Sequence, residues 1–205
     1  MADALKIREI YNRRAKRYDK ILSKLRYHAT IREILRSMSL NTNDGSKILD
    51  LGCGTGLATG VLKERFPKSE IIGFDYCEEM LNIYKKRFSE IETVIGDFNK
   101  GLNYFDSESF DLIVSTGAVS EYGDREKVIP FVYEILKNGG AFVNVGIKKN
   151  VMSLITRKVW HYKPMGKKDF ISACNKAGFS DIEKIKISWD CFPTNITKFV
   201  IKARK

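Results

Sequence analysis

The stretch Ile48–Gly56 reads ILDLGCGTG, which is an apolar strand, an acid, and three glycines at alternate positions. An apolar run that ends in glycines and resumes as a helical pattern, here Leu57–Phe66, predicts a strand–turn–helix unit. Such a unit places bare main chain at the carboxyl end of a sheet strand, where open α/β sheets bind ligands. Because glycine has no Cβ, a ligand can lie directly against the turn.

The spacing of the glycines excludes two common ligand sites. The dinucleotide pattern G-x-G-x-x-G would need its third glycine at Leu57 or Thr59, and no Gly-Lys-Ser/Thr follows to form a P-loop. The pattern D-x-G-x-G-x-G over Asp50–Gly56 instead resembles motif I of the class I S-adenosylmethionine-dependent methyltransferases. A tight turn that holds no ligand remains the alternative. The resemblance implies S-adenosyl-L-methionine as cofactor, S-adenosyl-L-homocysteine as product, and cofactor contacts from Asp50, Gly52, Cys53, Gly54 and Gly56.

Later segments resemble the other motifs of this family in the same order. In GFDYCEEML the resemblance implies that Asp75 holds the ribose, that Tyr76 packs on the adenine, and that Met80 opens the next helix beside the cofactor. A helix-capping or solvated Asp75 is the other interpretation. After the strand at 93–96, Asp97 is expected to bind the adenine amino group and Phe98 to meet the ring through its backbone N–H.

The fourth expected strand, Phe110–Ser115, runs into Thr116–Tyr122, the region that passes near the sulfonium in this family. The resemblance therefore adds Ser115 to the cofactor contacts. Many relatives carry histidines where Ser120 and Glu121 stand, so this chain lacks an obvious base there. Weak catalytic candidates remain, and they are Glu121, Tyr122 and His161.

The N-terminal segment Tyr11–Asp19 resembles a helix of small-molecule methyltransferases, including those of quinone and lipid metabolism. Tyr11, Ala15 and Tyr18 fall on one helical face. The resemblance implies that this face covers the cofactor as a lid with its two tyrosines. The alternative is a helix that packs both tyrosines on the core.

The order of elements predicts an α/β fold, a Rossmann-like three-layer α/β/α sandwich. Its seven-stranded sheet is mostly parallel, and the family resemblance implies an antiparallel last strand beside the fifth. We expect a single methyltransferase domain over residues 1–205. It comprises a helical lid or arm (1–40), a polar linker (41–46), a cofactor-binding core (47–147), and an acceptor-side segment with a terminal β-hairpin (148–205). The hairpin strands are expected at 181–189 and 197–203.

The composition limits which cellular location, metal sites and partners we expect. The 205 residues carry a net charge of +11, and residues 6–36 hold eleven Lys or Arg against three acids. The absence of a long apolar run or leader predicts neither a membrane span nor secretion. Four cysteines without a C-x-x-C pair argue against zinc and fit a cytoplasmic protein. No carboxylates show metal-site spacing, so no metal is expected.

Three functions fit these observations. The first is a methyltransferase for a small-molecule acceptor, which the basic surface suggests is anionic or lipid-like and in peripheral contact with a membrane. The second is a tRNA or rRNA methyltransferase that uses the basic rim to bind nucleic acid. The third is a non-catalytic S-adenosylmethionine-binding protein, because the segment Thr116–Tyr122 contains no obvious catalytic base.

Overall fold

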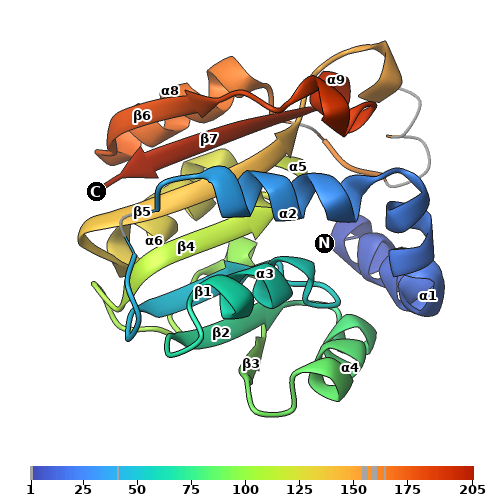
Figure 1. Cartoon of the computed structure of the whole chain (residues 1–205), viewed down its shortest axis with the longest axis horizontal. Helices are drawn as coiled ribbons and strands as arrows, with labels where there is room; N and C mark the ends of the chain where they lie inside the picture. The colour runs from blue at the N-terminus through green and yellow to red at the C-terminus, as the bar shows by residue number, and fades with distance from the viewer. Residues whose placement is uncertain (1, 41, 154–156, 158–160, 164) are drawn as a thin grey trace.

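Seven strands form one sheet in the order β3-β2-β1-β4-β5-β7-β6 (Figure 1). The computed structural model describes residues 2–40, 42–153, 157, 161–163 and 165–205. Strand β7 is antiparallel to β5 and β6, and the other neighbours are parallel, which confirms the predicted topology. The strands are β1 Lys47–Leu51, β2 Glu70–Asp75, β3 Glu92–Ile95, β4 Phe110–Thr116, β5 Leu136–Ile147, β6 Ser180–Ile185 and β7 Lys198–Arg204.

Helices cover both faces of this sheet and one of its edges (Figure 1). The α-helices are α1 Ala2–Lys24, α2 Tyr27–Ser37, α3 Leu57–Arg65, α4 Glu78–Arg87, α5 Val119–Tyr122, α6 Arg125–Ile135, α8 Lys167–Ala177 and α9 Thr194–Thr197. Two short 3₁₀ turns are η1 Phe98–Lys100 and η2 Trp189–Cys191.

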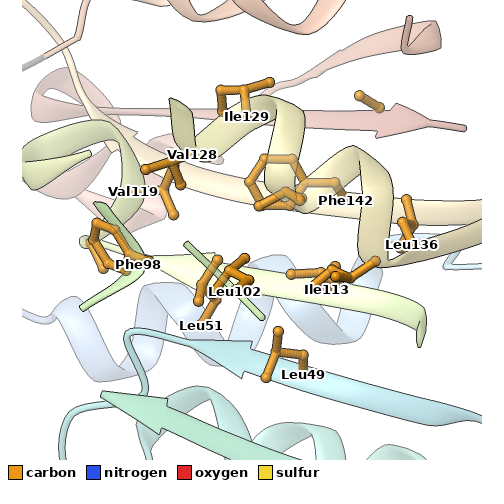
Figure 2. Packing of buried hydrophobic residues seen from close by; sticks show 14 of the residues in the cluster. Leu49, Leu51, Phe98, Leu102, Ile113, Val119, Val128, Ile129, Leu136 and Phe142 are labelled. Carbon is orange, nitrogen blue, oxygen red and sulfur yellow. The ribbon is translucent and has the colours of Figure 1, made fainter. Parts of the chain in front are cut away.

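The central strand β4 shows why the sheet has two buried faces. Leu112 and Val114 point into a cluster with α2 and α3, while Ile113 points into a second cluster with α6 and α8. All three side chains are buried, as expected for a parallel strand covered on both sides. Figure 2 shows the second cluster, where Ile113 and Phe142 meet the side chains of α6. The alternation of side chains along each strand therefore builds the three layers.

Two elements differ from the sequence-based expectation. Strand β6 ends at Ile185 rather than continuing to 189, because the Ser188 Oγ accepts the Asp190 N–H (3.3 Å) and the chain turns into η2. The Asn138–Gly140 segment resembles the family's Pro-Gly-Gly turn in sequence, but it lies in an irregular part of β5. The pairing with β4 skips from Leu136 to Ala141, and Gly139 takes a positive φ of 78° within the bulge.

The N-terminal arm is two helices with different roles. Helix α2 packs against α3 on the sheet face, and α1 lies beyond the carboxyl ends of the parallel strands (Figure 1). Ala15 of α1 is buried against Met80 and Cys77 of the α4 region. The arm therefore covers the edge where the glycine turn lies.

No helix in the described part of the chain combines the length and the apolar character needed to cross a membrane.

Ile113 tests the central packing. Replacing this fully buried side chain by alanine leaves a cavity, so Ile113→Ala should lower the free energy of unfolding by about 2–5 kcal/mol. Urea denaturation followed by circular dichroism measures the loss. The matched control is Ile95→Ala, since Ile95 is 49% exposed and should cost less than about 1 kcal/mol. Equal losses in the two variants would contradict the assigned core.

Candidate functional site

The glycine turn after β1 presents main chain to an open cleft. Gly54 has a φ of +54°, and a Cβ placed on it would meet no atom within 4 Å. Gly52 differs, because its Cβ would lie 2.2 Å from the Cβ of Ala118. Gly52 thus permits the close approach of the segment after β4, and Gly54 leaves space in front of the turn. A side chain at either position would fill the cleft or push its walls apart.

Asp75, at the end of β2, is held by backbone N–H groups. The Gly54 N–H donates to its Oδ2 (2.8 Å), and the Cys77 N–H donates to its Oδ1 (2.9 Å). Burial raises the pKa of Asp75, and these backbone hydrogen bonds oppose the shift. Each carboxylate oxygen has a second acceptor position. Asp75 also lines the narrow cleft described below, so its carboxylate can accept hydrogen bonds from a ligand there.

Four of the expected cofactor residues lie behind the turn and line none of the three cavities described below: Asp50, Cys53, Gly56 and Ser115. The Asp50 Oδ2 accepts the Thr59 N–H (3.0 Å) and hydroxyl (2.7 Å), so this carboxylate anchors the start of α3. The Ser115 Oγ accepts the Val119 N–H (3.2 Å). The expected cofactor contacts of these four residues stay predictions.

Cys53 and Gly56 serve the packing of α4. Cys53 is buried in a cluster with Leu81 and Tyr84. A Cβ on Gly56 would lie 2.5 Å from the Phe88 ring, so the third glycine makes room for an aromatic side chain. Some residues of the motif therefore face the cleft, and others pack against the helices behind the turn.

Three cavities meet at this edge of the sheet. The narrow cleft, about 50 Å³, is lined by Gly52, Gly54, Asp75, Met80 and Gly117, among others. The outer cavity, about 550 Å³, shares Tyr76, Phe98 and Tyr122 with the narrow cleft and adds Asp97, Asn99 and His161. The apolar chamber, about 270 Å³, includes Leu22, Leu25, Ile147, Met152, Tyr162 and Pro193.

Asp97 and Tyr76 face the outer cavity in different ways. Asp97 caps η1, because its Oδ1 accepts the Asn99 N–H (3.0 Å), and it lines the outer cavity beside Phe98. The Tyr76 hydroxyl is buried and has no hydrogen-bond partner among the described residues. Burial raises the pKa of Tyr76. These side chains leave polar atoms available to a bound group.

Three tyrosines separate the narrow cleft from the apolar chamber. Tyr11 and Tyr18 come from α1 and Tyr122 from α5, and all three line both spaces. The Tyr11 and Tyr122 hydroxyls are 2.8 Å apart, and the ring of Tyr11 meets both other rings edge-on. Burial raises the pKa of each of the three, so they stay neutral at physiological pH. The arm therefore closes the cleft and also walls the chamber.

The catalytic candidates lie in different places. Glu121 is 2% exposed and accepts hydrogen bonds from the Lys198 Nζ (3.0 Å) and the Ser120 Oγ (2.7 Å). His161 is exposed, has a φ of +52°, and lines the outer cavity rather than the chamber. Its neighbours Trp160 and Pro164 lie outside the described residues. Tyr122 alone lines all three cavities.

Sequence reasoning missed Tyr27 and Lys198, which also line the apolar chamber. Lys198 opens β7 and pairs with Ile147 at the end of β5. Because β7 is antiparallel, its first residue lies at the carboxyl edge of the parallel strands. The predicted antiparallel last strand could therefore have indicated Lys198, whereas nothing in the local sequence marks Tyr27.

Part of the basic excess is compensated within the fold. Arg32 and Arg36 both contact the Glu64 carboxylate, and Arg87 contacts Asp19. The exposed side of α1 still carries several basic residues, among them Lys16, Arg17, Lys20 and Lys24. The described residues contain no group of three His, Cys, Asp or Glu side chains placed to hold a metal ion.

The sequence matches one family model and is similar to many known methyltransferases. A family model described as a methyltransferase domain matches residues 48–140. A demethylmenaquinone methyltransferase of Thermotoga maritima is 32% identical over 57% of this chain and 50% of its own length. A ubiquinone/menaquinone biosynthesis C-methyltransferase of Campylobacter jejuni is 27% identical over 96% of this chain and 84% of its own length. The chain spans about half the length of the Thermotoga protein and 28% of a Candida albicans sterol 24-C-methyltransferase.

Solved structures share the fold at low identity. A chain of the Haloferax volcanii complex between the Trm112 methyltransferase activator and a methyltransferase superposes with a TM-score of 0.80 at 20% identity, covering 95% of this chain and 97% of that one. Geranyl diphosphate C-methyltransferase of Streptomyces coelicolor gives 0.72 at 13% identity, covering 87% and 81%. These similarities support the Rossmann-like fold.

The buried carboxyl of Asp50 should make the free energy of unfolding depend on pH. Burial raises its pKa to about 7, above the value in an unfolded chain. A raised carboxyl pKa contributes stability at low pH that is lost as the pH rises through the folded value. Relative to the wild type, Asp50→Asn should therefore gain free energy of unfolding, on the order of a few kcal/mol, between about pH 4 and about pH 7. Urea titrations at several pH values measure this difference.

Asp111 provides the control of opposite sign. Burial raises the pKa of its carboxyl, but hydrogen bonds from the Lys137 ammonium and the Lys47 N–H outweigh burial and lower it. Asp111→Asn should therefore lose stability relative to the wild type as the pH rises through the carboxyl range. Parallel pH profiles of the two variants would refute the assignment for Asp50.

Proposed function

Because the chain belongs to the class I S-adenosylmethionine-dependent methyltransferases, we propose that it transfers a methyl group from S-adenosyl-L-methionine to a small, largely apolar acceptor. The observation that carries this proposal is the juxtaposition of Gly54, with open space before it, and Asp75, buried but facing the same cleft. Bare main chain beside a carboxylate suits a nucleoside, whose ribose hydroxyls donate to the acid.

We assign the described cavities to parts of the cofactor. Asp75 would accept the ribose hydroxyls, and Tyr76, Met80, Asp97 and Phe98 would surround the adenine along the narrow cleft and the outer cavity. Tyr11 and Tyr18 would cover the methionine part beside Gly52 and Gly54. The Tyr76 hydroxyl, which has no partner among the described residues, and the Asp75 carboxylate in the lining of the narrow cleft favour a polar ligand there.

Methyl transfer would require little from the protein beyond positioning the acceptor and excluding water. The cofactor supplies a methyl group on a positive sulfonium, and the carbon–sulfur bond breaks with its electron pair passing to sulfur as the acceptor's lone pair forms the new bond. Walls that position the acceptor in line and exclude water can then supply most of the acceleration. Tyr11, Tyr18 and Tyr122 stand between the two spaces and are suited to this positioning.

The apolar chamber favours a small acceptor over RNA. Its walls are mainly Leu, Ile, Met, Pro and Tyr side chains, which would bury an apolar molecule favourably. Relatives named for quinone and sterol methylation support the same class. The exposed lysines and arginines of α1 could hold the protein near an anionic membrane surface that carries such an acceptor. RNA binding that weakens steeply with salt would favour the nucleic-acid alternative instead.

We place the protein in the cytoplasm. Its four cysteines, Cys53, Cys77, Cys174 and Cys191, are buried free thiols, as a reducing compartment allows. Calorimetric titration with S-adenosyl-L-methionine, together with release of labelled methyl groups onto an extract of apolar metabolites, tests the proposed function. Cofactor binding without any transfer would favour the non-catalytic alternative.

The ribose assignment makes a quantitative prediction. Asp75→Ala should weaken cofactor binding by about 1–3 kcal/mol, because the ribose hydroxyls lose their acceptor. Calorimetry with S-adenosyl-L-homocysteine measures the loss. Glu78→Ala is the control, since this acid lies three residues away with 65% of its side chain exposed and should leave affinity unchanged. Unaltered binding in Asp75→Ala would remove Asp75 from the site.

The glycine turn permits a sharper comparison. Gly54→Val should abolish detectable cofactor binding, because its side chain would project into the cleft. Gly45→Val carries a comparable backbone strain, since Gly45 also has a positive φ (+95°) and open surroundings, but it lies in the linker before β1. This control should lose stability and keep affinity. Normal binding by folded Gly54→Val would show that the ligand lies elsewhere.

A further inference from the structure

A small polar cluster interrupts the apolar chamber. It consists of the Tyr27 hydroxyl, the Glu121 carboxylate and the Lys198 ammonium. A Cβ placed on Gly117 would lie 3.3 Å from the Tyr27 hydroxyl, 3.8 Å from the Lys198 Nζ and 3.9 Å from the Glu121 Oε1. The three polar atoms therefore gather around one glycine that carries no side chain.

The cluster is costly for a purely structural feature. Glu121 and Lys198 form an ion pair (3.0 Å) whose side chains are only 2% and 14% exposed. Replacing such a pair with apolar residues is often neutral or stabilising. Burial raises the pKa of Tyr27, and a hydrogen bond from the Thr116 side chain opposes that shift. No described group accepts the proton of the buried Tyr27 hydroxyl in standard geometry. A buried hydroxyl whose proton has no acceptor is unfavourable, which points to an acceptor atom that arrives with a ligand.

Gly117 links this cluster to the reaction. It lines both the narrow cleft, where the cofactor is assigned, and the apolar chamber, where the acceptor is assigned. Lys198 and Glu121 line the chamber as well. A ligand oxygen bound at the cluster would therefore lie at the junction of the two spaces. The rest of that ligand would lie among apolar side chains.

We propose that Tyr27 and Lys198 bind the acidic hydroxyl oxygen of a phenol or enol acceptor in its ionised form, and that Glu121 orients Lys198. This inference rests on the proposed methyl transfer. The ammonium of Lys198 has three donors, of which Glu121 takes one, so it can donate to an anionic oxygen as well. The Tyr27 hydroxyl donates the second hydrogen bond, and the Tyr27 ring lies 5.1 Å from the Lys198 Nζ and supports its charge.

The charge of the acceptor explains how transfer proceeds although Glu121 is already engaged. The acceptor's hydroxyl proton leaves to solvent on binding, so no proton moves during methyl transfer. A negative oxygen and a positive sulfonium neutralise each other as the new bond forms, and an apolar chamber favours that loss of charge. The cluster selects acceptors that ionise readily, while the chamber walls select for an apolar body.

The probe for this site is 4-nitrophenol, whose ionised form absorbs visible light and whose acid form does not. With S-adenosyl-L-homocysteine present, the wild-type protein should bind it about tenfold or more tightly than nitrobenzene, which lacks the hydroxyl. The titration midpoint of bound nitrophenol should fall below that of the free probe. Equal affinity for both probes, or an unshifted midpoint, would overturn the inference.

Two variants and a matched control localise the effect. Tyr27→Phe removes only the hydroxyl, whose proton has no acceptor among the described residues, so the variant should stay folded and bind the nitrophenolate about tenfold more weakly. Lys198→Met should abolish the shifted midpoint, and Lys198→Met with Glu121→Gln should do the same without leaving a buried unpaired charge. Lys202→Met is the control, since Lys202 lies on the same strand, is 3% exposed and paired with Glu183, and lines none of the cavities.

The outcomes separate this inference from the proposed function. A midpoint shift that survives in Lys198→Met, or that Lys202→Met removes equally well, refutes the role of the cluster. Calorimetry with S-adenosyl-L-methionine on the same samples tests cofactor binding independently. Cofactor binding with an unshifted probe rejects only the acidic acceptor, whereas absent cofactor binding rejects the methyltransferase function itself.

Discussion

The hydrogen bond from the Gly54 N–H to the Asp75 carboxylate joins the two turns on which the site depends. One turn follows β1 and the other follows β2, and these neighbouring parallel strands bring them to the same edge of the sheet. The bond fixes the carboxylate beside bare main chain. It also satisfies part of the hydrogen-bonding capacity of a buried acid. Every assignment of cofactor contacts starts from this pair.

The remaining walls come from distant parts of the chain. The Tyr11 and Tyr122 hydroxyls meet across 111 residues, and Lys198 meets Glu121 across 77. Helix α1 reaches the cleft because it packs on α4 through Ala15. Lys198 reaches the chamber because β7 runs antiparallel and begins at the carboxyl edge of the sheet. The apolar chamber is therefore formed where the N-terminal arm and the C-terminal segment meet the core of the sheet.

The apolar chamber and its polar cluster place two different requirements on a ligand. The apolar chamber would reject a strongly hydrated molecule. A fully apolar ligand, in turn, would offer no acceptor to the Tyr27 hydroxyl or the Lys198 ammonium. An acceptor with one acidic oxygen and an apolar body satisfies both constraints. In the proposed function the three tyrosines would hold that acceptor against the methyl donor, and burial raises the pKa of each, so they would add no charge to the junction.

The sequence by itself determined the alternation of strands and helices and the glycine turn followed by Asp75, because hydrophobic patterns and glycine spacing are local signals, and the resemblance to a family supplied the antiparallel last strand. The same signals could not tell which motif side chains face the ligand. Asp50 follows the pattern as closely as Asp75, yet it turns toward Thr59 behind the turn. Tyr27 and Lys198 carried no local mark at all. Only the tertiary structure decided these roles, because the direction of a side chain and the partners it meets depend on strands and helices far away in the chain.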